Sequence, residues 1–285
     1  MSLFLTYVVS GIATGCTFAL VATGFVVIYR VSRVVNFAQG VFAVIAGMVA
    51  SSLLTRNLPH GPAEVLAVAV AALAGLAVGA IAIGRPGTPP LASLIITLGL
   101  GIGSYAVIIL IWGDQPVSYS GLPGLARLGG VSIQLQFLLV VAVTAITFAL
   151  LSLFFDHTYP GKALTACSSN PYAARLVGID VRRMGLVAFA LGGALGGLAG
   201  VLITPLQPVS FDSDVGIAIN GFAAAIFGGL LRPGTALVGA LVLGVAEALV
   251  AGYYRASFES GVALVIMLGL MVWRASRGAI AEEPE

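Results

Sequence analysis

Few side chains in this sequence combine a reactive type with a spacing that could do chemistry. Asn36 and Gln39 lie three residues apart, so their amides share one face of a helix. Glu247 is the acidic residue placed well inside an apolar run. A carboxylate inside a membrane costs about 2.5–3.5 kcal/mol on insertion scales, and buried amides there need partners. These residues are therefore candidates for lining a translocation path, with structural hydrogen bonds between helices as the alternative.

Other kinds of chemistry have little support in the sequence. The two histidines, His60 and His157, are each alone in a connecting segment, and no cysteine or histidine cluster has metal-ligand spacing. Neither a G-x-S-x-G nucleophile motif nor a P-loop occurs. Cys16 and Cys167 fall in dissimilar segments, so no bridge is expected. We expect no metal, no cofactor and no ATPase or other enzyme activity from the chain itself.

The composition indicates which elements position these residues. The chain has 285 residues, of which 59% are hydrophobic and 8% are charged, against about 25% charged in a soluble domain. A soluble fold with so few charges would expose a continuous apolar surface, so much of this surface must face lipid. The net charge of +2 gives no indication of nucleic-acid binding. The absence of a basic N-terminal region argues against a cleavable signal peptide.

Apolar runs long enough to cross a bilayer predict an all-α, polytopic transmembrane helical bundle of about eight or nine spans. We assign residues 1–285 to a single domain. The predicted spans are 4–29, 37–55, 65–84, 91–113, 133–155, 184–206, 214–231, 235–252 and 258–273. The regions 29–47 and 214–252 are the least regular, and either could instead hold a re-entrant or broken helix.

The positions of the basic residues predict the orientation. If the loop 156–183 is cytoplasmic, ten of the 13 basic residues lie inside, and the N-terminus lies outside. Asp212 and Asp214 then fall near the outer end of a span. They either begin a solvated helix, where acids are favoured, or contact a substrate-delivery protein. Gly192, Gly196 and Gly200 have small-xxx-small spacing, which predicts close helix packing, within the chain or against a partner permease.

The loop 156–183 is the longest polar stretch between spans. Asn170 is a good N-cap, Pro171 suits the first helical position, and Gly178 can end the helix. We therefore predict a short helix over 171–177, with Ala174, Leu176 and Val177 on an apolar side. A plain connecting loop is the alternative to a docking element for a cytoplasmic partner.

Ordered motifs along nearly the whole chain resemble branched-chain amino acid ABC-transporter permeases of the LivH type. The loop motif A-C-x-x-x-x-x-x-A-x-x-x-G-I-x-V matches from Ala166 to Val181. The signature R-V-x-N-F-A-H-G matches from Arg33 to Gly40, with Gln39 in place of histidine. Further matches are the runs 94–100, 221–229 and 244–247, whereas the G-S-I-P-G element keeps only Pro233 and Gly234.

The resemblance implies an ABC importer permease in a bacterial inner membrane that moves branched-chain or other hydrophobic amino acids. It implies two ATP-binding subunits, a second related permease and an extracytoplasmic binding protein as partners. Thr97 joins the translocation-path candidates through its motif. The implied residues for coupling to the ATPase are Asn170, Pro171, Ala173, Ala174, Arg175 and Gly178. Related permeases for urea or short amides are one alternative, and an ion-coupled secondary transporter is another.

Overall fold

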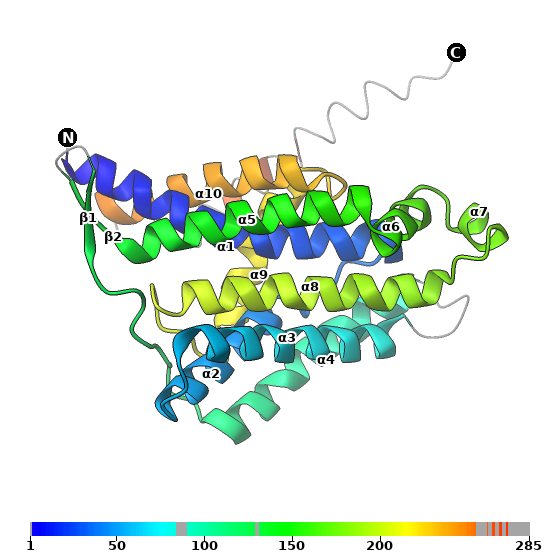
Figure 1. Ribbon diagram of the computed structural model, residues 1–285, viewed down its shortest axis with the longest axis horizontal. Coiled ribbons are helices and arrows are strands. Elements are labelled where there is room, and N and C mark those ends of the chain that lie inside the picture. Colours follow the sequence, from blue (N-terminus) through cyan, green and yellow to red (C-terminus); the bar gives the residue numbers. More distant parts are fainter. Residues whose placement is uncertain are drawn as a thin grey trace, which may run out of the picture.

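The computed structural model describes residues 2–83, 90–128 and 131–254, together with positions 261, 264, 265, 268, 269 and 272. Long helices lie roughly side by side along one direction (Figure 1). The elements are α1 (Ser2–Ser32), α2 (Gln39–Thr55), α3 (His60–Ala82), α4 (Pro90–Trp112), β1 (Leu125–Leu128), β2 (Val131–Gln134), α5 (Leu135–His157), α6 (Tyr159–Ser169), α7 (Pro171–Leu176), α8 (Val181–Ile203), α9 (Ser213–Phe227) and α10 (Pro233–Tyr253).

Eight of the nine predicted spans correspond to helices, and the all-α bundle is confirmed. Six helices are long and apolar enough to cross a membrane, namely α1, α3, α4, α5, α8 and α10. The helices α2 and α9 are apolar but shorter, with 17 and 15 residues. At a rise of about 1.5 Å per residue they reach only about 22–26 Å. The predicted span 258–273 lies largely outside the described residues.

The irregular region 29–47 contains a buried break between α1 and α2. Arg33 has a left-handed φ of 57° and redirects the chain after α1. Of the non-helical residues that follow, Val34, Asn36 and Ala38 are buried, whereas Phe37 is 37% exposed. The side chain of Gln39, the first residue of α2, reaches Gly192 in the middle of α8. Irregular backbone at membrane depth is tolerated where protein covers it, as it does at Val34, Asn36 and Ala38.

The region 214–252 is a helical hairpin formed by α9 and α10. Helix α9 begins against the first turn of α2, where Gly40 lies in contact with the backbone of Asp214. It ends at the turn 228–232, in which Gly229 and Leu230 have positive φ. The sequence predicted two spans of equal length here. The structure has a short helix, α9, that starts inside the bundle and a longer helix, α10, that returns.

Small residues bring the helix backbones into contact. Gly244 of α10 lies directly against the backbone of Gly11 and Gly15 of α1. Gly200 of α8 lies against the backbone of Ala43 in α2. Such close approach is the usual role of small residues in membrane bundles. The glycine series Gly192, Gly196 and Gly200 therefore packs within this chain against α2 and α1, and the suggested contact with a partner permease is not needed to explain it.

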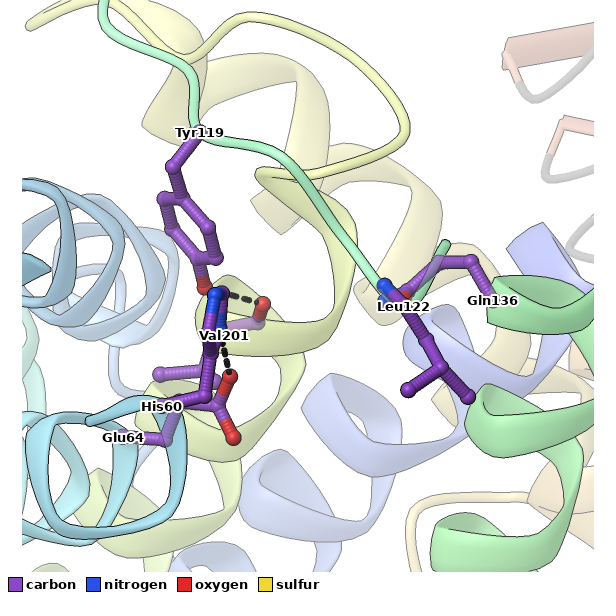
Figure 2. A network of polar contacts seen from close by, with 6 residues as sticks. All are labelled: His60, Glu64, Tyr119, Leu122, Gln136 and Val201. Carbon is purple, nitrogen blue, oxygen red and sulfur yellow. Dashed lines mark hydrogen bonds and ion pairs between the residues drawn. The ribbon is translucent and has the colours of Figure 1, made fainter. Parts of the chain in front are cut away.

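The segment 113–124 crosses one end of the bundle and is held at three points. Val117 forms an antiparallel bridge with Val209. The Tyr119 hydroxyl donates to the Val201 carbonyl oxygen over 2.7 Å, and the Leu122 N–H donates to Gln136 Oε1 over 2.9 Å. Figure 2 shows these two contacts on either side of the segment. The chain then enters the antiparallel pair β1–β2 and continues into α5.

The opposite end of the bundle carries arginines beside α6. Arg30, Arg33 and Arg232 line one cavity together with Ser168 and Ser169. Arg30 and Arg33 come from the end of α1 and Arg232 from the start of α10. They gather at the end of the bundle that holds the loop 156–183, as the predicted orientation requires. Arg85, Arg255, Arg274 and Arg277 lie outside the described residues.

Candidate translocation site and cytoplasmic surface

The amides of the α1–α2 break form a closed hydrogen-bond network. Asn36 Nδ2 donates to Gln39 Oε1 over 3.4 Å, and Gln39 Nε2 donates to the Gly192 carbonyl oxygen over 2.8 Å. The Phe37 N–H donates to Thr97 Oγ1 over 3.3 Å, which attaches the break to α4. Asn36, Gln39 and Thr97 are fully buried. The network thus holds the break in place, and a role for these three side chains in a path stays a prediction.

Glu247 connects the two arms of the α9–α10 hairpin. Its side chain is 1% exposed, and Asn220 Nδ2 of α9 donates to Glu247 Oε2 over 3.3 Å. A buried carboxylate in a membrane needs such a partner. Sequence reasoning missed Asn220, because the amide lies 27 residues from Glu247 and no local spacing connects them.

An apolar cavity lies between α1, α4 and α9, beside the α1–α2 break. Its volume is about 380 Å³. Most of the residues around it are apolar: Phe25, Phe37, Leu98, Gly101, Ile102, Val215, Ala218, Ile219 and Phe222. The two polar members of its wall are Tyr105 and Asp214. Small-molecule sites in proteins commonly combine mostly apolar walls with a few converging polar groups.

One reading of the sequence placed Asp214 in solvent at the start of a helix. Asp214 does lie in the first turn of α9, but its side chain is buried. It is 5% exposed, and its Oδ1 accepts a hydrogen bond from the Tyr105 hydroxyl over 2.8 Å. Asp212, two residues earlier, is exposed and accepts from Ser210 instead. Sequence reasoning could not separate these two acids, since the difference comes from Tyr105 of α4, whose side chain reaches Asp214 at the start of α9.

The loop 156–183 contains two helices where one was predicted. Thr158 caps α6 by accepting from the Gly161 N–H over 3.1 Å. Asn170 caps α7, since its Oδ1 accepts from the N–H groups of Tyr172 and Ala173, both over 3.0 Å. Gly178 adopts a left-handed φ of 83° just after α7. The predicted cap, first residue and stop signal of α7 are confirmed, while the cap of α6 at Thr158 was missed.

The exposed face of α7 differs from the predicted one. Ala174 is 3% exposed and packs toward the protein, while Tyr172, Leu176 and Val177 are each more than two-thirds exposed. Figure 1 shows α7 projecting beyond the ends of the long helices. The apolar side that we predicted is therefore divided: Ala174 anchors the helix, and the larger side chains point outward.

Arg33 and Cys167 fix α6 on the bundle. Arg33 Nη2 donates to the Ser168 carbonyl oxygen over 2.8 Å, which ties the end of α1 to the end of α6. The Cys167 side chain is 1% exposed, and burial raises the pKa of its thiol, while Arg175 acts in the opposite direction. Cys167 and Cys16 are both free. Among the described residues, no three His, Cys, Asp or Glu side chains are grouped as metal ligands.

The six membrane-length helices among the described residues define a multi-pass membrane protein. The chain belongs to the family described as the permease component of branched-chain amino acid transport systems, whose model matches residues 7–272. This match confirms the family resemblance drawn from the ordered motifs.

Several known permeases are similar in sequence to this chain over most of their length. The chain is 27% identical to the high-affinity branched-chain amino acid transport permease LivH of Salmonella typhimurium, covering 93% of this chain and 92% of that one. It is 27% identical to BraD of Pseudomonas aeruginosa, covering 95% and 94%. A ribose import permease, RbsC of Escherichia coli, is 25% identical over 89% of this chain and 81% of its own length.

One solved structure supports the fold. It is PsaBC from Streptococcus pneumoniae in complex with Fab, with a TM-score of 0.51 and 15% identity, covering 95% of this chain and 91% of that one. At this identity, the likeness shows a shared fold and nothing about the substrate.

Proposed function

We propose that this chain is the membrane-spanning permease subunit of an ABC importer for branched-chain or other hydrophobic amino acids. The observation that carries the proposal is the α6–α7 projection. It presents Tyr172, Leu176 and Val177 to solvent on a short helix that is capped and anchored at Ala174. An exposed apolar helix held rigidly at the base of the bundle suits a groove on a partner protein.

The energy source in this proposal is separate from the chain. The sequence has no P-loop, so two ATP-binding subunits would supply the hydrolysis. Their movement would reach the helices through α7 and α6, which is joined to α1 by the bond from Arg33 to Ser168. Asn170, Pro171, Ala173, Ala174, Arg175 and Gly178 would form or shape the coupling surface. A second, related permease subunit would complete the pore in the inner membrane of a bacterium.

The cavity favours an apolar substrate within this family. Its walls are built mainly from aliphatic and aromatic side chains of α4 and α9. Urea or a short amide would find few polar partners on such walls, whereas a branched aliphatic side chain would bury apolar surface against them. An extracytoplasmic binding protein would deliver the amino acid from the side of the segment 113–124.

The test begins with purification of the tagged chain from its own cells in mild detergent. We expect two ATPase subunits and a second permease to purify with it. After reconstitution, liposomes that receive ATP and a liganded binding protein should accumulate labelled leucine and not urea. Uptake by the chain alone, driven by an ion gradient without ATP, would contradict the proposal.

A further inference from the structure

The cavity between α1, α4 and α9 is asymmetric in its chemistry. Leu98, Ile102 and Ile219 contribute aliphatic surface, while Tyr105 and Asp214 bring a hydroxyl and a carboxylate to its polar part. No arginine, lysine or histidine lines it within the part of the chain that the structure describes. Its volume of about 380 Å³ lies at the lower end of the range for small-molecule sites.

A carboxylate in an apolar wall costs free energy unless it finds enough partners, so such a residue is a candidate for a functional role. The Asp214 carboxylate accepts a hydrogen bond from the Tyr105 hydroxyl. A carboxylate offers about four acceptor positions, so an incoming donor still finds one. With no cationic side chain in the wall, the donor that best matches this acid is a positively charged group on the ligand.

We infer that Asp214 and Tyr105 form the ammonium-binding end of a transit site for an aliphatic amino acid. The α-ammonium group donates to the Asp214 carboxylate, and the Tyr105 hydroxyl holds that carboxylate in position. The aliphatic side chain lies against Leu98, Ile102 and Ile219, and the substrate carboxylate stays toward the open side of the cavity. The inference rests on the proposed function and assigns substrate groups to particular side chains.

The chemistry separates this substrate from other classes. A neutral amide or urea would not compensate the charge of Asp214, and an anion would be repelled by it. A sugar would lack both a cationic group and an aliphatic chain to cover the walls. A compound with a primary ammonium next to a branched apolar chain satisfies both parts of the cavity.

The first experiment uses the whole importer complex in liposomes and compares Asp214→Asn with Asp212→Asn. The control removes the same charge two residues away, at an exposed acid that lines a different cavity. We expect Asp214→Asn to lower leucine uptake by about tenfold or more, the effect of losing a hydrogen bond to a charged group. ATP hydrolysis stimulated by the binding protein should continue, so that fewer leucine molecules cross per ATP.

Equal leucine uptake by the Asp214→Asn and wild-type complexes would overturn the inference. If the Asp214→Asn complex does not assemble, Tyr105→Phe provides the test, because it removes one hydroxyl and leaves the ring in the wall. Reduced uptake with normal assembly then supports the site, and unchanged uptake contradicts it. A wild-type complex that imports no aliphatic amino acid would instead contradict the proposed function.

The second experiment examines the apolar part of the site with Gly101→Val on α4. A Cβ at Gly101 would make ordinary contacts of 3.8 Å with Ala38 and Phe37, so the valine projects into the cavity without a backbone clash. We expect leucine uptake to fall relative to valine uptake by about tenfold, the usual cost of one unaccommodated methylene. Gly103→Val is the matched control, since nothing lies within 4 Å of a Cβ there. An unchanged leucine-to-valine ratio in Gly101→Val would overturn the assignment of these walls.

Discussion

The Gln39 side chain donates to the carbonyl oxygen of Gly192 over 2.8 Å, and so joins the first residue of α2 to the middle of α8. The same amide accepts from Asn36, which closes the network across the α1–α2 break. Replacing Gln39 by leucine removes both bonds and deprives the buried Asn36 side-chain N–H of its Gln39 acceptor. We expect a loss of about 1–3 kcal/mol, the penalty for an unsatisfied buried group.

The loss in Gln39→Leu should appear as a lower unfolding temperature of the detergent-solubilised chain. Ser104→Ala is a suitable control, because it removes a helix side-chain donor whose bond is only local, to Gly101 three residues earlier. Equal unfolding temperatures for Gln39→Leu and the wild type would show that the network contributes nothing to stability.

The contact of Gly200 with the backbone of Ala43 predicts a strong effect of adding a single methyl group. A Cβ at Gly200 overlaps the Ala43 backbone, so Gly200→Ala must push α2 away from α8. Overpacking of this kind costs about 1–3 kcal/mol. Gly103→Ala, where the methyl group meets open space, should leave the unfolding temperature unchanged or slightly raised. Similar stabilities for the two variants would contradict the close packing of α2 on α8.

Capping of α7 by Asn170 predicts a coupling defect with little effect on the bundle. Asn170→Ala removes the acceptor for two backbone N–H groups, at a cost of about 1 kcal/mol to the local helix. We expect binding-protein-stimulated ATP hydrolysis and uptake to fall together, while the thermal stability of the bundle changes little. Asn170→Asp should restore most of the activity because aspartate is an equally good cap. A defect that aspartate does not relieve would argue against capping as the cause.

The outward side chains of α7 allow the docking surface to be separated from its anchor. Val177→Asp places a charge on a residue that is 76% exposed, so it should reduce ATPase co-purification without unfolding the permease. Ala174→Arg forces a long side chain into a buried position and should disturb α7 itself. Retention of both ATPase subunits by Val177→Asp would exclude this face from the interface.

Tyr119 predicts a dependence of stability on alkaline pH. Burial, with a smaller contribution from Glu64, raises the pKa of Tyr119 above its ordinary value. The folded state therefore keeps this proton where the unfolded chain releases it, and stability is lost as the pH rises above about 10. Unfolding temperatures measured between neutral and alkaline pH should fall more steeply for the wild type than for Tyr119→Phe. Parallel curves would show that Tyr119 ionises equally in both states.

Composition and the length of the apolar runs were sufficient to predict the helical bundle, because a helix satisfies its own backbone groups in lipid. The local signals of α7 were equally clear, since Asn170, Pro171 and Gly178 act on their immediate neighbours. These features depend on residues close together in the sequence, where capping and backbone preferences operate directly.

The candidate site could not be predicted in the same way. Tyr105 and Asp214 are separated by 109 positions and meet only in the folded bundle. The sequence indicated an irregular region at 29–47, but it did not show where α2 begins, because hydropathy continues through residues 37–55. Such features follow from tertiary contacts, which a pattern along one segment does not contain.

The bond between Gln39 and Gly192 spans 153 positions, and this separation has a consequence for biogenesis. During synthesis, α2 leaves the ribosome long before its partner α8 exists. Until α8 enters the bilayer, the Gln39 side-chain N–H lacks its Gly192 acceptor and must remain near water or an insertion factor. We therefore expect the first helices to be held in an immature arrangement and to settle only when the second half of the chain arrives.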